Sequence, residues 1–323
     1  MKKYLGILLV FISAFTLTSC INATEYHDVY VTVYPMQYIA EEIFEGTEYT
    51  AGIVPGVTSH ESSVDWSPKE IIAMTEANFL FYVGANYDQY IDNQINSIFI
   101  NKDVQLIKIE EETDYIQFIE GEVHECNEDG VESIDEDADI GIDPHFWVSP
   151  ERIIQVAELM FDYIIAEFDD SENIMQSNYD TLKANLQALS DDFFEVISNA
   201  NNHVMTSTNI YGYLRTDYGF DYISISPGYH EEVEQFTSQE QQDIVDEAIE
   251  HNIKYLIYEM YSTSPLSNAI FSALEEEGLD PIKLEFNILQ ALSDDNIEQG
   301  SDYISVMYEN LDLLIIALGY EAE

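Results

Sequence analysis

The sequence is poor in cysteine, in basic residues and in long apolar segments. It has two cysteines, Cys20 and Cys126, so no disulfide framework can hold the chain together, and an apolar core must stabilise the fold. Ten Lys and Arg stand against 63 Asp and Glu, giving a net charge of −53 that argues against nucleic acid as a partner. This charge is explained either by a saline habitat, which we favour, or by concentration of cations at the surface.

The first twenty residues have the order of a secretory signal. Two lysines precede a largely apolar stretch over residues 4–17, which is shorter than the roughly twenty residues that span a bilayer. Leu17-Thr-Ser-Cys20 resembles the lipobox of bacterial lipoproteins, in which the cysteine is acylated and becomes the mature amino terminus. We therefore predict a signal peptide over 1–19 and a tether over 20–27, lipidated at Cys20 and held at the extracellular face of the cytoplasmic membrane. No later segment has transmembrane length, so we expect a soluble mature body.

Strands and helices alternate along most of the chain, which predicts an α/β fold with mostly parallel sheets flanked by helices. Segments rich in β-branched and aromatic residues predict strands at 28–34, 49–54, 79–83, 104–109, 203–207, 222–226, 255–258 and 281–286. Helical spacing predicts helices at 37–44, 67–76 and 303–318. Two lobes, at 28–168 and 201–323, joined by a helix over 169–200 are the simplest assembly. A ligand should then lie between them, near the carboxyl ends of the strands.

Residues 151–200 have almost continuous helical spacing, without Gly or Pro. Asp169-Asp-Ser171 predicts a break and a new amino-terminal cap. The apolar positions that we expect to face the core are Ile153, Ile154, Ala157, Met160, Phe161, Ile164, Leu182, Leu186, Leu189, Phe193 and Phe194.

Two histidines lie in loops where ligand-binding groups concentrate. His60 follows a predicted strand and precedes Trp66-Ser-Pro68, and His145 lies in Asp143-Pro-His-Phe-Trp-Val-Ser-Pro150. Prolines restrict both loops, and a neutral imidazole is the commonest transition-metal ligand in proteins. The shared context favours a metal site over two unrelated surface histidines.

The chain resembles the zinc- and manganese-specific solute-binding proteins of ABC importers, a family that includes the streptococcal zinc adhesin-type lipoproteins. Asp-Pro-His-Phe-Trp-Val-Ser-Pro looks like the family's Asp-Pro-His-x-Trp-x-x-Pro, and Ala77–Gly84, Tyr211–Phe220 and Phe286–Leu292 are similar to further family segments. The resemblance implies two α/β lobes bridged by a rigid helix, His60 and His145 as metal ligands, zinc or manganese as cargo, an importer permease as partner and no enzymatic activity. It also implies a monomer.

Two positions depart from the family's ligand pattern. Thr208 stands where the family has a third ligand, His or Glu, and Asn287 where it has Asp, with Gln290 as an alternative register. A hydroxyl and an amide are poor zinc ligands and supply no negative charge, so we expect weaker binding than is usual for the family unless other groups contribute. The residues that could do so are His203, His230 and Glu259.

The acidic segment 125–139 replaces the His-rich loop of many zinc members. Its oxygen-bearing residues fall at some positions of a calcium-binding loop, although Glu stands at position 1 and no flanking helix pair is visible. A solvated acidic loop is the interpretation that we favour. The residues of the calcium alternative are Glu125, Asn127, Asp129 and Glu136.

Two other classes of function stay open. A metallohydrolase built on His60 and His145 would need a third protein ligand and a general base, and the chain has no His-Glu-x-x-His motif. A surface adhesion or interaction protein with a degenerate metal site is compatible with Thr208 and Asn287.

Overall fold

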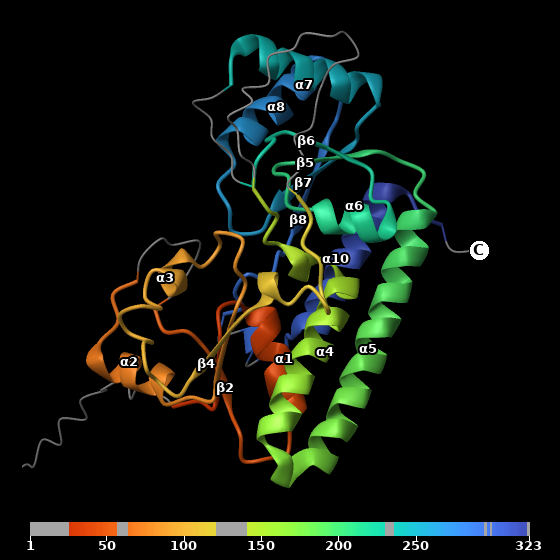
Figure 1. Ribbon diagram of the computed structural model, residues 1–323. Coiled ribbons are helices and arrows are strands. Elements are labelled where there is room, and N and C mark those ends of the chain that lie inside the picture. Colours follow the sequence, from red (N-terminus) through yellow and green to blue (C-terminus); the bar gives the residue numbers. More distant parts are fainter. Residues whose placement is uncertain are drawn as a thin grey trace, which may run out of the picture.

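Two four-stranded parallel sheets and a group of long helices make up the computed structural model (Figure 1). The structure describes residues 26–56, 64–120, 141–229, 236–293, 296–297 and 299–321. The first sheet has the order β2-β1-β3-β4 and the second β6-β5-β7-β8, with every pair parallel. The predicted α/β fold class is confirmed.

The amino-terminal sheet consists of short strands joined by helical crossovers. Its elements are β1 (Val29–Val31), α1 (Tyr34–Phe44), β2 (Ala51–Ile53), α2 (Pro68–Thr75), β3 (Phe79–Tyr82), α3 (Gln89–Asp92), β4 (Gln105–Lys108) and a 3-10 turn, η1 (Ile109–Glu111). Ser67 caps α2 in a capping box with Glu70, as its sequence predicts. Helix α1 begins three residues before the predicted start, because Pro35 fits the first helical turn.

The second half repeats the pattern after two long helices. Its elements are η2 (Phe146–Val148), α4 (Pro150–Glu167), η3 (Asp169–Ser171), α5 (Glu172–Ser198), β5 (Val204–Thr206), α6 (Gly212–Tyr218), β6 (Tyr222–Ser224), α7 (Ser238–Glu250), β7 (Tyr255–Glu259), α8 (Pro265–Glu276), β8 (Ile282–Phe286) and α10 (Tyr303–Leu318). The break at 169–171 is present, and Ser171 is the N-cap residue of α5, although its side chain makes no cap hydrogen bond.

The central strands of each sheet, β1 and β3 in the first and β5 and β7 in the second, are buried on both faces. In β3, Phe79 and Phe81 join the core that α1, α4 and α5 cover, whereas Leu80 and Tyr82 face a smaller cluster near α2 and α3. This alternation fits a parallel sheet that is covered by helices on both sides. The larger core continues through α5 into the second sheet, where it includes Tyr222.

Helix α5 lies along one side of the molecule beside α4 and extends to the level of the second sheet (Figure 1). Of the apolar positions predicted on α4 and α5, Phe194 is the exception: it is 57% exposed. Phe193 is buried, and the next helical residue points about 100° away from it, which here turns Phe194 toward solvent. The last helix, α10, packs against α5, and Tyr303 stacks on Tyr38 of α1. The lobe limits at 168 and 201 stay a prediction.

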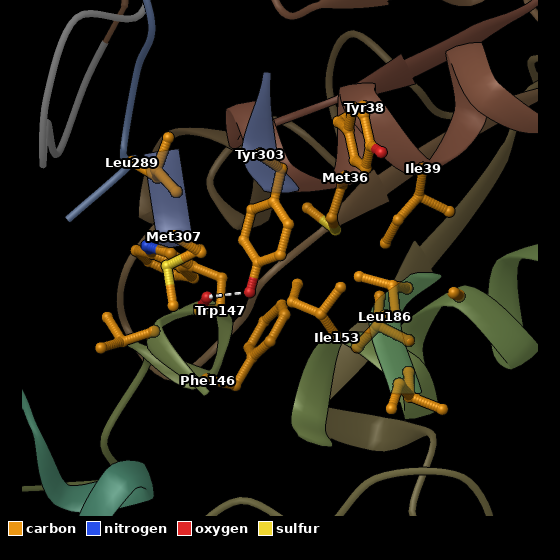
Figure 2. Packing of buried hydrophobic residues seen from close by; sticks show 14 of the residues in the cluster. Met36, Tyr38, Ile39, Phe146, Trp147, Ile153, Leu186, Leu289, Tyr303 and Met307 are labelled. Carbon is orange, nitrogen blue, oxygen red and sulfur yellow. Dashed lines mark hydrogen bonds between the residues drawn. The ribbon is translucent and has the colours of Figure 1, made fainter. Parts of the chain in front are cut away.

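Trp147 connects the amino-terminal half of the chain to the carboxyl-terminal half through hydrogen bonds (Figure 2). Its indole Nε1 donates to the backbone oxygen of Ile288 at 2.8 Å, and its own backbone oxygen accepts from the Tyr303 hydroxyl at 3.0 Å. Arg152 on α4 holds Asp217 on α6 through both carboxylate oxygens, at 2.6 to 3.0 Å. These contacts fix the backbone next to His145.

Candidate metal centre

His145 is 2% exposed and lies just before η2, in the turn that leads into α4. Oxygen Oδ1 of Asp143 lies 2.9 Å from Nδ1 of the imidazole and also accepts the backbone N–H of His145 at 2.9 Å. An ionised carboxylate can only accept, so Nδ1 carries the proton in this pair. The contact therefore fixes both the tautomer and the orientation of the ring, which is how buried metal-binding histidines are usually held.

Asp143 is itself fixed by contacts from both halves of the chain. Its backbone N–H donates to the Ile119 oxygen at 3.0 Å, and its backbone oxygen accepts from the Tyr213 hydroxyl at 2.8 Å. Its carboxylate also approaches Gly212 closely, since a Cβ atom at that glycine would lie 2.9 Å from Oδ2. A glycine at the start of α6 thus leaves room for the carboxylate that orients His145.

Three aromatic rings surround the imidazole of His145. The ring centroids of Tyr229, Trp147 and Tyr87 lie 5.0, 5.3 and 6.4 Å from it. Burial and the nearby Asp143 raise the pKa of the Tyr229 hydroxyl above its ordinary value, so this phenol stays neutral at physiological pH. The rings exclude bulk water and lower the local dielectric around the imidazole.

Tyr87 reaches this position through a strained loop after β3. Gly84, Ala85 and Asn86 have φ values of 86°, 48° and 58°, a run of three left-handed residues that only glycine adopts without cost. The carboxylate of Glu110 accepts the Ala85 N–H at 2.7 Å and so holds the middle of the loop.

Asp88 closes the same loop from its other end. Its carboxylate accepts the backbone N–H of Val83 at 2.7 Å, that of Gly84 at 2.9 Å and the Thr32 hydroxyl at 2.7 Å. Asp88 is buried, and this burial raises the pKa of its carboxyl to about 6, although the three donors oppose the shift. The loops after β1 and β3 therefore meet at one buried acid, where the strand order of the sheet reverses.

Thr208 and Glu259 meet at the corresponding point of the second sheet. They follow β5 and end β7, which are neighbouring strands, and the Thr208 hydroxyl donates to Oε1 of Glu259. Tyr211 lies close by, and burial together with the Glu259 charge raises the pKa of its hydroxyl well above the usual value. Two of the predicted candidates thus form one pair at the carboxyl edge of the sheet.

A short chain of contacts connects this pair to His145. Asn209, which follows Thr208, donates its backbone N–H to the Gly228 oxygen at 3.0 Å. Tyr229, which follows Gly228, packs its ring against the imidazole of His145. The loops after β5 and β6 therefore lie on the same side of the molecule as His145.

Asn287 and Gln290 occupy the loop after β8. Oxygen Oδ1 of Asn287 accepts the Leu289 N–H at 2.9 Å, so the side chain shapes its own turn, and the backbone N–H of Asn287 donates to Oδ1 of Asn310 at 2.9 Å. The Gln290 side chain instead hydrogen-bonds the hydroxyl of Tyr87, whose ring faces His145.

His203 lies apart from the other candidates. It precedes β5, whereas Thr208 follows this strand, and strands advance about 3.3 Å per residue, so the two residues lie on the order of 15 Å apart. His203 contacts Asp221 and His251 instead. The structure therefore places His203 and Thr208 at opposite ends of β5.

Several predicted residues lie outside the described residues: Cys20, His60, Glu125, Asn127, Asp129, Glu136 and His230. Within the described ranges no group of three or more His, Cys, Asp and Glu side chains is arranged to hold a metal ion. In the same ranges no helix has the length and apolar character that crossing a membrane requires.

Sequence reasoning did not assign a role to Asp143, Asp88 or Tyr229. For Asp143 a signal was available, since an acid two residues before a histidine, across a proline, can turn back onto the ring. Asp88 and Tyr229 gave no comparable signal, because their roles depend on contacts between segments that are distant in the chain.

Three comparisons place the chain among known proteins. A family model described as "Zinc-uptake complex component A periplasmic" (ZnuA) matches residues 29–317. The zinc-binding lipoprotein AdcA of Streptococcus pneumoniae serotype 4 is 25% identical over 329 residues, which cover 97% of this chain and 60% of AdcA. The chain thus spans about three-fifths of the length of that relative. The high-affinity zinc uptake system protein ZnuA of Bacillus subtilis is 23% identical, with 88% of this chain and 86% of that protein covered.

The solved structures show the same fold. The crystal structure of the Zn(II)-bound ZnuA-like domain of Streptococcus pneumoniae AdcA superposes with a TM-score of 0.67 at 20% identity. It covers 92% of this chain and all of that domain. The arrangement of two parallel sheets flanked by helices, with a long helix beside them, is therefore common to both.

Proposed function

Because the chain belongs to the family of zinc-uptake complex component A, we propose that it captures a divalent transition metal, zinc or manganese, and delivers it to the permease of an ABC importer. It acts as a binding protein and not as an enzyme. The observation that carries this proposal is the contact between Asp143 and Nδ1 of a buried His145. This contact directs coordination of a metal to Nε2, with His60 as the second imidazole ligand.

We propose that the carboxylate of Glu259 supplies the negative charge that offsets the bound cation. Two neutral imidazoles leave a divalent cation uncompensated, and Thr208 has no charge to offer. The Thr208 hydroxyl donates to the Glu259 carboxylate, which keeps that carboxylate at the edge of the sheet where the family's third ligand is expected. Asn287 and Gln290 could add only neutral oxygens, so one negative charge is the most that the described candidates supply.

We further propose that Cys20 carries a lipid that retains the protein at the extracellular face of the cytoplasmic membrane. The lipobox-like Leu17-Thr-Ser-Cys20 supports this, and so does the description of the AdcA relative as a lipoprotein. Replacing Cys20 with Ala should release the protein from membranes or leave the signal uncleaved. Unchanged processing together with unchanged membrane retention would refute the anchor.

Thr208 and Asn287 favour one second candidate, a surface interaction protein that no longer binds metal. The experiment that separates the two functions measures the metal content of protein purified without chelators and then titrates the metal-free protein with zinc and manganese. The proposed function predicts about one equivalent of tightly bound metal. Protein that is metal-free as purified and does not respond to either cation would support the interaction protein instead.

A further inference from the structure

Two histidines and an aspartate lie together at the amino edge of the second sheet, at the opposite end from Thr208. His203 precedes β5, Asp221 precedes β6, and His251 follows α7 just before β7. In a parallel sheet all strands begin at one edge, and the strand order β6-β5-β7 places these three positions in a row. The pairing of Val204 with Tyr222 puts His203 directly beside Asp221.

The side chains make the contacts that this order predicts. Nδ1 of His203 lies 2.8 Å from Oδ2 of Asp221, and the imidazoles of His203 and His251 meet edge to face, with ring centroids 5.1 Å apart and an interplanar angle of 67°. The His203 and Asp221 side chains are 49% and 72% exposed, and His251 is also exposed. The cluster is therefore open to ions from solution and takes no part in the core.

The chemistry of the cluster suits a transition metal. The Asp221 carboxylate accepts the Nδ1 proton, which leaves Nε2 of His203 as the nitrogen with a lone pair to offer. The imidazole of His251 lies next to that of His203, with ring centroids 5.1 Å apart, and water can complete the coordination at an exposed position. Two imidazoles select borderline cations such as Zn²⁺, Ni²⁺ and Cu²⁺ over Ca²⁺ and Mg²⁺, which prefer oxygen ligands.

A purely structural role explains the cluster less well. An edge-to-face pair of rings stabilises a fold mainly when it is packed, and less when water reaches both rings. An exposed ion pair contributes about as little.

We propose that His203 and His251 form a second, peripheral site for a divalent transition cation, with Asp221 as the residue that orients His203. With two protein ligands, this site binds more weakly than the centre at His145. It is independent of that centre, because it lies at the other end of β5.

The test is a competition titration of the metal-free protein with Zn²⁺, which should resolve a tight and a weaker equivalent. His203→Gln and His251→Gln should each abolish the weaker equivalent and leave the tight one unchanged. Asp221→Asn should weaken it by about 10- to 100-fold. Asp280→Asn is the matched control, since Asp280 is an exposed acid that precedes β8 at the same edge of the sheet, and its variant should bind as the wild type does.

Substoichiometric Cu²⁺ gives a second readout through paramagnetic broadening of amide signals. Broadening should centre on residues next to the cluster, such as Val204, Tyr222 and Asn252, and should vanish in both histidine variants. If both variants keep the weaker equivalent and the broadening, the proposal is wrong. If the wild type binds a single equivalent of Zn²⁺ and His203→Gln abolishes it, the proposed function at His145 is overturned and this second site is supported.

Discussion

The carboxylate of Asp143 holds both the backbone N–H and the ring Nδ1 of His145, each at 2.9 Å. One oxygen thereby fixes the position of the residue and the tautomer of its ring. The contact is buried and is supported by Tyr213 from the other half of the chain, so the imidazole is placed before any metal arrives. Such preorganisation reduces the ordering cost of binding.

Asp143→Asn should weaken zinc binding by about 10- to 100-fold without unfolding the protein, because it removes the carboxylate that orients the ligand. Isothermal titration of wild type and variant measures the loss. Asp162→Asn is the control, since the Asp162 carboxylate accepts the exposed Tyr115 hydroxyl, away from His145. Equal affinities in Asp143→Asn and the wild type would show that His145 does not depend on this contact for binding.

Glu259→Gln should lower zinc affinity by about tenfold or more, because it removes the one negative charge that we assign to the site. An interaction of a few kcal/mol is expected between a carboxylate and a divalent cation at an effective dielectric of about 20. Glu275→Gln, an exposed change on α8, is the matched control. An unchanged affinity in Glu259→Gln would remove this residue from the site.

Restoring the family's ligand types should strengthen binding. Asn287→Asp keeps the acceptor that the Leu289 N–H requires, so the turn should persist while a charge is added. Thr208→His adds a nitrogen donor at the end of β5. For the double variant we expect a gain in binding free energy of roughly 1–3 kcal/mol, or about ten- to hundredfold in affinity, after the cost of desolvating the new carboxylate. Tight binding by the wild type with no gain in the double variant would mean that other residues already complete the site.

Asp88 should give the protein a specific pH dependence of stability. Burial raises the pKa of its carboxyl to about 6, above the value of roughly 4 expected in the unfolded chain. The folded state therefore binds this proton more tightly, and the resulting stabilisation is present below about pH 4 and is lost as the pH rises through 6.

The measurement compares wild type with Asp88→Asn in denaturant unfolding between pH 4 and pH 7. Because the amide of the variant cannot take up the proton, the stability advantage of the wild type should grow by up to about 3 kcal/mol as the pH falls across this range. The exposed control Asp191→Asn should show a difference from the wild type that barely changes with pH. A constant or shrinking advantage over Asp88→Asn would contradict the raised pKa.

The alternation of strand and helix segments was sufficient to predict the fold class, because both sheets are parallel and their strands are short and rich in apolar residues. The prediction that Phe194 faces the core was wrong, because apolar residues at adjacent positions of a long helix do not reveal which of them is exposed. Among the site residues, the sequence motif singled out His145, which the structure buries against Asp143, Tyr87 and Tyr229.

The rest of the candidate site depends on tertiary contacts. Thr208 and Glu259 are 51 residues apart and meet only because β5 and β7 are neighbours in the sheet. From the sequence, either His203 or Glu259 could lie beside Thr208. The structure shows that His203 precedes β5 whereas Thr208 follows it, and that Glu259 ends the neighbouring strand β7. Asp88 acts through backbone groups of Val83 and Gly84, whose left-handed loop has no clear signature beyond its glycine.

The central claim is that the metal binds His145 through Nε2 together with His60. A crystal structure of the zinc-loaded protein, with zinc located by its anomalous scattering, tests this most directly. Our account predicts one zinc ion about 2.0–2.1 Å from Nε2 of His145 and from a ring nitrogen of His60, with the Asp143 contact to Nδ1 retained. A tightly bound zinc ion that His145 does not coordinate, or imidazoles of His60 and His145 too far apart to share one ion, would contradict it.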